Sequence, residues 1–342
     1  MAEFSKKLKI LLAENKHERD PNRGSYRIWI RDLAEYLKTK NVEVYLTKDK
    51  PIDFYDVCIL GKKCTREDYI KERKPNQLLG LINPPSENGK IWKHINFCIV
   101  GSIEEKDSLI QFCPNIFVFP LIENIFMKVP RKIHVKKDTI VIGYHGNSFH
   151  LNHMEPNIKR AIQNIAKEHK VIFMVITGGM TKIKDWTKGR PTNVETKIIN
   201  WTLPNFKKFI KDIDIGIVPN ISEFNIGGTN NIPQEGKYST DIRIRFKNKS
   251  NNGRALVFHQ NGIPVVADIT PSNMHILANP DNGYAVLGEK GWYYAFKELM
   301  DEKHRNFISE NAYNEFHRLY NPYEWAGKLL KNIEVLHSKH QI

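Results

Sequence analysis

The sequence predicts a two-domain α/β protein in which each domain contains a parallel sheet. Short apolar runs alternate with helical patterns along the chain, which is typical of βαβ units. This alternation of strand and helix patterns is absent at residues 124–137 and resumes after them. A length of 342 residues is enough for two hydrophobic cores. We therefore expect one domain over residues 1–130 and a second over residues 138–322.

The first half contains a series of strand-like runs and one clear helical pattern. The runs read LKILLAE, VEVYL, YDVCILG, LLGLIN, NFCIVGS and NIFVFPL. Residues 25–38 predict a helix, because apolar side chains recur there at helical spacing. Residues 124–137 lack such a pattern and are predicted to connect the domains.

The second half repeats the pattern from a new buried strand, TIVIGYHG. Further strands are predicted at VIFMVITGG, TKIINWT and DIGIVPN, with helices over residues 156–169 and 204–212. The stretch 221–245 is polar and rich in Gly and Asn, and loops of that length are usually functional or mobile. An apolar helix follows, and Gly262-Ile263-Pro264 then leads into the short strand Val265-Val266-Ala267.

The start of this apolar helix is the most informative part of the chain. Ser250, Asn251 and Asn252 open the helix, so that backbone N–H groups and the positive end of the helix dipole are available to an anion. Lys249 and Arg254 add full positive charges at the same end. The segment therefore predicts a diphosphate site at the carboxyl side of an α/β sheet. A capped helix with solvated charges is the alternative.

Composition and charge narrow the classes of partner. The formal net charge is +14, which indicates an anionic partner: a nucleoside diphosphate, an acidic membrane surface, an acidic polysaccharide or nucleic acid. Because the lysines are scattered rather than gathered in a stripe, nucleic acid is disfavoured. No apolar run approaches the length of a membrane span, and no signal peptide is recognised.

The four cysteines show neither disulfide nor zinc spacing. Cys58 and Cys98 lie inside apolar runs and are predicted to fill core positions. A reducing compartment is therefore expected.

Several segments, taken in order, resemble the retaining glycosyltransferases of family 4, which have the GT-B fold. They read KILLAENKHERDPNRGSYRIWIRDLAEYL, TIVIGYHGNSFHLNHMEPNIKRAIQNI, INWTLPNFKKFIKDIDIGIVPN, KSNNGRALVFHQNGIPVVAD and YNPYEWAGKLLKNIEVL. The likeness spans nearly the whole chain. GIPVVA is moderately specific, and the other motifs are loose and gain weight from their order and spacing.

The resemblance implies two Rossmann-like domains that face each other across a cleft, with the C-terminal helix 323–342 completing the N-terminal, acceptor domain. It implies transfer of a hexose from a nucleoside-diphosphate sugar to a hydroxyl of a glycan or lipid-linked acceptor, with retention and without a metal or other cofactor. A cytoplasmic protein, held by its basic surface at the inner face of an anionic membrane or at an acidic acceptor, would fit this activity. The alternatives are a nucleotide-sugar epimerase of the same fold and a catalytically inactive binding relative.

This sequence also departs from the family pattern. The positions at which the family carries two Glu residues around the phosphate helix hold Lys249 and Val257 here. The family's diphosphate-binding Arg and Lys fall near Asn147 and His153. A rearranged phosphate site is therefore expected, with cations crowded near Lys249, Arg254, Arg243 and Arg245.

Candidate roles follow from these positions. Lys249 and Arg254 are predicted to stabilise the leaving diphosphate as its charge develops. Residues expected to bind the nucleotide or its phosphates are Gly24, Arg245, Ser250, Asn251, Asn252, Gly146, Asn147 and Trp201. Residues expected to bind sugar or acceptor are His145, His153, Ser272 and Asn273.

Structural roles remain open for several of these side chains. Gly24 fits a simple strand-to-helix turn, His145 a satisfied structural histidine, and Trp201 a core position. His17, Glu18 and Asp20 lie in the first loop, where they are either solvated charges or an acceptor base of the kind that an inverting enzyme would need.

Overall fold

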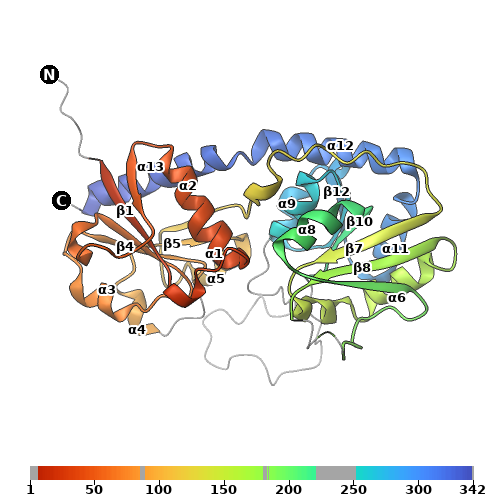
Figure 1. The fold of residues 1–342 in the computed structure, drawn as a ribbon, viewed down its shortest axis with the longest axis horizontal. Helices are drawn as coiled ribbons and strands as arrows, with labels where there is room; N and C mark the ends of the chain where they lie inside the picture. The colour runs from red at the N-terminus through yellow and green to blue at the C-terminus, as the bar shows by residue number, and fades with distance from the viewer. Residues whose placement is uncertain (1–6, 85–88, 180–182, 184, 221–251, 341–342) are drawn as a thin grey trace. The chain divides into compact units, whose positions relative to one another are not determined.

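The computed structural model describes residues 7–84, 89–179, 183, 185–220 and 252–340 (Figure 1). The chain divides into two compact units. Unit 1 consists of Met1–Ile125 and Arg318–Ile342, and unit 2 consists of Phe126–His317.

Unit 1 contains a parallel six-stranded sheet in the order β2-β1-β3-β4-β5-β6. Its strands are β1 (Leu8–Ala13), β2 (Val42–Tyr45), β3 (Val57–Leu60), β4 (Leu78–Ile82), β5 (Phe97–Val100) and β6 (Ile116–Val118). Every residue of β3, β4 and β5 is buried, as expected for inner strands of a parallel sheet that is covered on both faces.

The helices of unit 1 are α1 (Gly24–Tyr26), α2 (Leu33–Lys38), α3 (Glu67–Glu72), α4 (Gly89–Trp92), α5 (Ile103–Leu109) and α13 (Pro322–His340). A π-helical segment, Arg27–Asp32, joins α1 to α2, so the predicted helix over residues 25–38 is confirmed with an irregular central part. Ala326 and Ile333 of α13 belong to the same apolar cluster as Ile10 of β1 and Leu33 of α2. The C-terminal helix therefore contributes to the core of unit 1.

Unit 2 contains a second parallel sheet, in the order β12-β11-β10-β7-β8-β9. Its strands are β7 (Thr139–His145), β8 (Lys170–Thr177), β9 (Glu195–Asn200), β10 (Ile215–Val218), β11 (Val265–Asp268) and β12 (Gly283–Val286). The helices are α6 (Asn157–Ile165), α8 (Leu203–Phe209), α9 (Gly253–Gln260), α10 (Pro271–Ile276), α11 (Gly288–Glu298) and α12 (Glu302–Leu319). The strand GYAV of β12 was not predicted from the sequence, because it is short and opens with glycine.

These two sheets confirm the predicted α/β class with two Rossmann-like domains. In each sheet, the strands that come directly after the first strand are added on one side of it, and the later strands are added on its other side. The strand order reverses between β1 and β3 in unit 1, and between β7 and β10 in unit 2. In open α/β sheets, ligands bind at the carboxyl ends of the strands that flank such a reversal. The topology therefore selects one candidate position in each unit.

The predicted connection over residues 124–137 is anchored to unit 2 by a buried aspartate. Asp214, at the amino end of β10, accepts from Lys132 Nζ at 3.0 Å and lies 2.5 Å from Lys137 Nζ. The backbone N–H of Val141 donates to the second oxygen of the same carboxylate at 2.8 Å. This carboxylate thus ties the connecting segment to two neighbouring strands.

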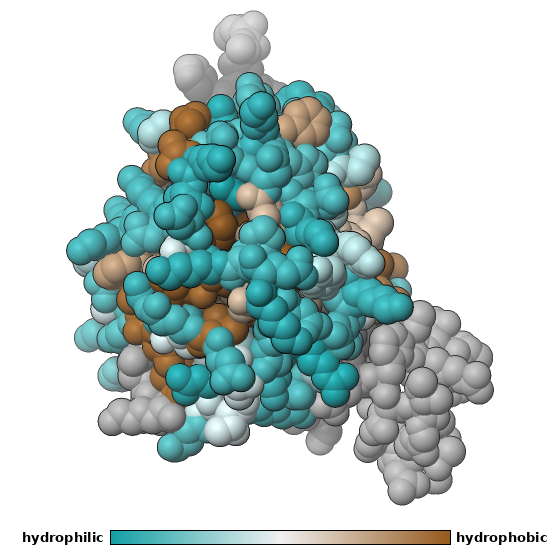
Figure 2. Space-filling view, turned by 90° about the vertical axis from the view of Figure 1, so that its right-hand side faces the viewer, coloured by the Kyte–Doolittle hydropathy of each residue, from teal (hydrophilic) through white to brown (hydrophobic). Residues whose placement is uncertain are grey.

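The face in Figure 2 is largely hydrophilic, with hydrophobic side chains in smaller areas between the polar ones. Within the described ranges, no helix has the length and apolar character of a membrane span. Cys58 and Cys98 are fully buried, as predicted, and Cys64 and Cys113 are buried as well.

Candidate functional site at the carboxyl ends of β7 and β10

The strand reversal of unit 2 brings three segments to one place. His145, Gly146 and Asn147 end β7 and begin the next loop, while Pro219 and Asn220 follow β10. The side chain of Arg254, in the first turn of α9, reaches both segments. An arginine and a helix amino end at the carboxyl edge of a parallel sheet form an arrangement that suits an anionic ligand.

Arg254 is held by hydrogen bonds to the loop after β10. Its Nη2 donates to Asn220 Oδ1, and its Nη1 lies 3.4 Å from the carbonyl oxygen of Pro219. The guanidinium also lies over the ring of Tyr144, 5.6 Å from the ring centre. Asn220 is fully buried, and its Nδ2 has no hydrogen-bond partner in the part of the chain that the structure describes. The guanidinium group of Arg254 is therefore positioned by neutral groups. Among the described residues, no carboxylate forms a hydrogen bond with it that would neutralise its charge.

Gly146 allows Arg254 to approach the end of β7. Its φ of +134° is a conformation that other residues rarely adopt. A Cβ atom at this position would lie 2.9 Å from the hydroxyl of Tyr144 and 3.2 Å from Cδ of Arg254. Glycine is thus required here by both backbone conformation and space. The phosphate-binding role expected for Gly146 stays a prediction, but the glycine lies at the expected place.

His145 contacts the backbone of α9. Its Nε2 lies 3.2 Å from the carbonyl oxygen of Arg254, and its ring packs against Phe206 and Phe258 at centre distances of 5.1 and 4.9 Å. Burial lowers the pKa of His145 to about 3 from 6.5, so the imidazole is neutral at physiological pH. This environment indicates a positioning role within the protein and leaves little of the side chain for a sugar.

The predicted residues Ser272 and Asn273 belong to α10, and the backbone of Ser272 contacts Asn252 at the start of α9. Asn252, the residue before α9, donates through Nδ2 to the carbonyl oxygen of Ser272 at 3.5 Å and does not cap its own helix. Asn273 donates through Nδ2 to the carbonyl oxygen of Asp268 at 2.8 Å. The Oδ1 atoms of Asn252 and Asn273 are both buried, and neither has a hydrogen-bond partner among the residues described. A buried acceptor without a hydrogen bond destabilises the folded state unless water or a ligand donates to it.

The other predicted residues are placed less centrally. Asn147 is exposed and accepts from the N–H of Phe149 through Oδ1 at 3.0 Å. His153 is half-buried, with its ring beside that of Phe149. Trp201 follows β9, two strands away from β7, and its ring centre lies 5.7 Å from that of Phe206.

Gly24 belongs to unit 1, at the start of α1. A Cβ atom there would have its nearest neighbours at 3.8 and 3.9 Å, so the protein itself does not require glycine at this position. Lys249, Arg245, Ser250 and Asn251 lie outside the described residues.

The sequence reasoning missed Asn220 and Tyr144, the two side chains that hold Arg254. Asn220 ends the strand-like run DIGIVPN, so its position after a buried strand was a usable signal. Tyr144 lies within β7 and resembles any other buried aromatic residue in the sequence, and only the structure places it beside Arg254.

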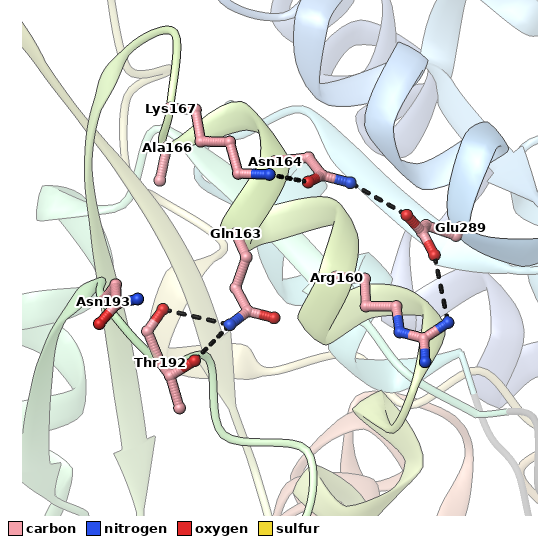
Figure 3. A pocket seen from close by; sticks show the side chains of 8 residues that line it. All are labelled: Arg160, Gln163, Asn164, Ala166, Lys167, Thr192, Asn193 and Glu289. Carbon is pink, nitrogen blue, oxygen red and sulfur yellow. Dashed lines mark hydrogen bonds and ion pairs between the residues drawn. The ribbon is translucent and has the colours of Figure 1, made fainter.

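A separate pocket of about 310 Å³ lies on α6, α11 and the loop before β9 (Figure 3). Its polar groups are largely paired with one another. Asn164 joins Lys167 to Glu289 through hydrogen bonds of 2.9 Å each, and Arg160 lies 3.7 Å from Glu289. None of the residues predicted to bind substrate lines this pocket. No group of His, Cys, Asp and Glu side chains among the described residues is arranged to hold a metal ion.

Comparisons with known proteins identify the fold. No protein-family model matches the chain, and no curated protein does. Among solved structures, the chain is similar to Alr3699/HepE of Anabaena in complex with UDP and glucose, with a TM-score of 0.59, 10% identity and coverage of 96% of this chain and 99% of that one. It is also similar to a glycosyltransferase from Rickettsia africae, with a TM-score of 0.55, 11% identity and coverage of 96% and 98%.

A third similar structure is TarM, with a TM-score of 0.52, 13% identity and coverage of 81% of this chain. The chain spans only about half of the length of TarM, 54%, and a similar share, 56%, of the pneumococcal O-GlcNAc transferase GtfA. At these identities the likeness shows the fold alone. The fold is that of the GT-B proteins, as the sequence resemblance predicted.

Proposed function

We propose that the protein is a glycosyltransferase that moves a hexose from a nucleoside-diphosphate sugar to a hydroxyl of a glycan or lipid-linked acceptor. We further propose that transfer proceeds with retention and without a metal ion. The resemblance of the sequence to retaining family 4 enzymes supports retention. The structures of HepE and GtfA, which were solved with UDP and a sugar, support a uridine diphosphate sugar as the first donor to test.

The observation that carries the proposal is the placement of Arg254. Its guanidinium lies at the carboxyl ends of β7 and β10, where an α/β sheet binds its ligand, and at the amino end of α9. Departure of a nucleoside diphosphate leaves negative charge on the phosphate oxygens. A fixed cation and a helix dipole stabilise that charge in a way that replaces a metal ion. Lys249 would add a second charge.

The charge of the whole protein also fits an anionic partner. A net charge of +14 attracts nucleotide donors and would hold the enzyme beside an acidic glycan or an anionic membrane on the cytoplasmic side. This attraction weakens as salt screens the charges.

A two-stage experiment tests the proposal. Thermal unfolding is first followed with UDP, GDP, ADP and TDP and with their common sugar conjugates, because a ligand that binds only the folded state raises the unfolding midpoint. The conjugates that shift the midpoint are then incubated with the protein, and nucleotide release is measured with and without glycan acceptors. Transfer that needs an acceptor supports the proposal. Donor isomerisation without an acceptor would instead indicate the epimerase, and binding without turnover the inactive relative.

A further inference from the structure

Asp268 is the last residue of β11, at the carboxyl edge of the unit 2 sheet. The strands β10 and β11 pair in parallel, with Val218 opposite Ala267. Asp268 therefore lies level with the start of the loop after β10, which carries Asn220, the residue that accepts from Arg254. The sequence reasoning gave Asp268 no role.

The carboxylate of Asp268 binds two donors from different elements. Its Oδ2 accepts from the backbone N–H of Asn220 at 2.7 Å, and its Oδ1 accepts from the indole N–H of Trp292, in α11, at 3.1 Å. Asp268 is 5% exposed, and Asn220 and Trp292 are fully buried. Because a buried carboxylate destabilises the folded state unless hydrogen bonds compensate, both donors are held firmly in place.

Asn220 transmits this constraint to Arg254. The backbone of Asn220 is fixed by Asp268, and its side-chain Oδ1 accepts from Nη2 of Arg254. The carboxylate thus acts on the guanidinium through a neutral amide. A direct ion pair would neutralise the positive charge, whereas a neutral amide leaves it available to an anionic ligand.

The backbone of Asp268 reaches the start of α9 by a second route. Its carbonyl oxygen accepts from Nδ2 of Asn273, in α10, at 2.8 Å. The carbonyl oxygen of Ser272, also in α10, accepts from Nδ2 of Asn252 at 3.5 Å. Because every residue has a backbone carbonyl, a substitution of Asp268 leaves this second route in place and tests the carboxylate alone.

We propose that Asp268 is a positioning residue for Arg254. Its carboxylate fixes Asn220, and Asn220 holds the guanidinium at the carboxyl ends of β7 and β10. A cation that is fixed before the ligand arrives stabilises phosphate charge without having to reorganise. This inference rests on the proposed function, in which Arg254 binds the diphosphate of the donor. Asp268 itself is assigned no contact with the donor.

Asp268→Asn tests the carboxylate with little change of shape. The new side chain has a single acceptor oxygen, so it can accept from Asn220 or from Trp292, and its NH2 group must face the other donor. The probe is whichever of UDP, GDP, ADP and TDP gives the wild-type protein the largest thermal shift, titrated into the full-length variant. We expect its affinity to fall by about threefold to tenfold, the effect of one lost hydrogen bond.

A second substitution should restore binding. Trp292→Phe removes the competing donor, so that in Asp268→Asn/Trp292→Phe the amide oxygen can turn to Asn220. We expect the affinity for the diphosphate to return to within about twofold of that of Trp292→Phe alone. The unfolding midpoint of the double variant should nevertheless lie below that of Asp268→Asn, because a smaller ring leaves a cavity in the core. A gain in affinity together with a loss of stability is not expected of a residue that only stabilises the fold.

Two further comparisons separate positioning from other roles. In the Arg254→Ala background, Asp268→Asn should cause no further loss of affinity, because its effect passes through Arg254. Asp214→Asn is the matched control, since Asp214 is a buried aspartate before β10 that also accepts from a backbone N–H, that of Val141. It should lower the unfolding midpoint and leave the affinity for the diphosphate unchanged.

The possible failures of this inference and of the proposed function differ. If Arg254→Ala weakened diphosphate binding and Asp268→Asn did not, the inference alone would be overturned. It would also be overturned by an equal loss of affinity in the presence and absence of Arg254, by a lack of recovery with Trp292→Phe, or by an equal loss in Asp214→Asn. A wild-type protein that binds none of the four diphosphates would instead contradict the proposed function, and the inference would fall with it.

Discussion

The imidazole of His145 and the backbone of Arg254 form a direct link between β7 and α9. The two atoms, Nε2 and the carbonyl oxygen, are 3.2 Å apart. Because a carbonyl can only accept, Nε2–H must donate, and the ring is neutral at its pKa of about 3. The link fixes the first turn of α9, from which the Arg254 side chain reaches the carboxyl ends of β7 and β10. His145 is therefore a positioning residue for the proposed phosphate site.

Replacing His145 with phenylalanine tests this link. The new ring can still pack against Phe206 and Phe258, but the hydrogen bond to the Arg254 carbonyl is lost. We expect the free energy of unfolding to fall by about 0.5–1.5 kcal/mol, since one buried hydrogen bond is lost. Donor affinity should fall as well, because Arg254 is no longer held in place. Urea unfolding and UDP titration measure the two effects, and unchanged values for both would contradict the positioning role.

Arg254→Ala should lower the rate of donor turnover by about a hundredfold or more, because one donor to the developing charge is removed. Lys249→Ala is expected to act in the same direction. Turnover is measured with the donor found by thermal shift, alongside the unfolding midpoint of each variant. Arg160→Ala is the matched control, since Arg160 lies in the same unit but on α6, in the pocket of Figure 3. Equal turnover in all three variants would remove the site assignment.

Gly146→Ala should disturb the same site from the end of β7. The φ of +134° is unfavourable for alanine, and the new Cβ would lie 3.2 Å from Cδ of Arg254. We expect lower stability and lower UDP affinity together. Gly178→Ala is the control, because Gly178 follows the neighbouring strand β8 and a Cβ atom there would have no neighbour within 4 Å. Equal effects of the two substitutions on UDP affinity would show that the approach of Arg254 to Gly146 is unimportant.

The sequence was sufficient to predict the fold because burial imposes a simple pattern on parallel strands. Runs such as VCIL of β3 and IGIV of β10 are apolar throughout, since both faces of the sheet are covered. The restart of the pattern at Thr139 correctly indicated a second sheet. The short strand β12 was missed, because four residues that begin with glycine give too weak a signal.

The candidate site was predicted in part, and the reason lies in how its members are assembled. Arg254 and Asn252 could be named as candidates from the sequence because a helix start with charged and amide residues is a local pattern. Asn220 joins them only through the pairing of β10 with its neighbours, which no local pattern records.

Asp214 provides a prediction about stability rather than activity. Its carboxylate is 2% exposed and binds both Lys132 and Lys137, which belong to the segment that leads into β7 of the same unit. Removing one partner of a buried ion pair leaves the others without compensation, so Asp214→Asn should lower the free energy of unfolding by about 3 kcal/mol. Urea unfolding measures this change.

An exposed pair in the same unit serves as the control for Asp214. Glu168 lies 3.7 Å from Lys297 at the surface, where solvent screens the attraction. Glu168→Gln should therefore leave the unfolding curve unchanged. If the two substitutions had equal effects, Asp214 would not have the anchoring role that its contacts indicate.

Three buried histidines of unit 2 predict that the protein loses stability in mild acid. Burial lowers the pKa to about 4 in His134 and His259 and to about 3 in His145, from a usual value of 6.5. Below pH 6.5 the unfolded chain binds protons at these positions and the folded chain does not. Stability is therefore full above pH 6.5 and falls as the pH decreases toward 4, by up to about 1.4 kcal/mol per pH unit for each histidine.

The slope of stability against pH distinguishes these histidines from other titrating groups. In unit 1, burial raises the pKa values of Glu14 and Asp32, so protonation of these carboxylates favours the folded state in acid. The pKa values of His94 in unit 1 and His317 in unit 2 are also lowered, so these two histidines add to the decline below pH 6.5. His259→Phe should reduce the decline by at most about one third while leaving its sign unchanged. Unfolding midpoints at half-unit intervals between pH 7.5 and 4.5 measure the slope. A dependence of the midpoint on pH that is the same in His259→Phe as in the wild type would contradict the assignment of the decline to buried neutral histidines.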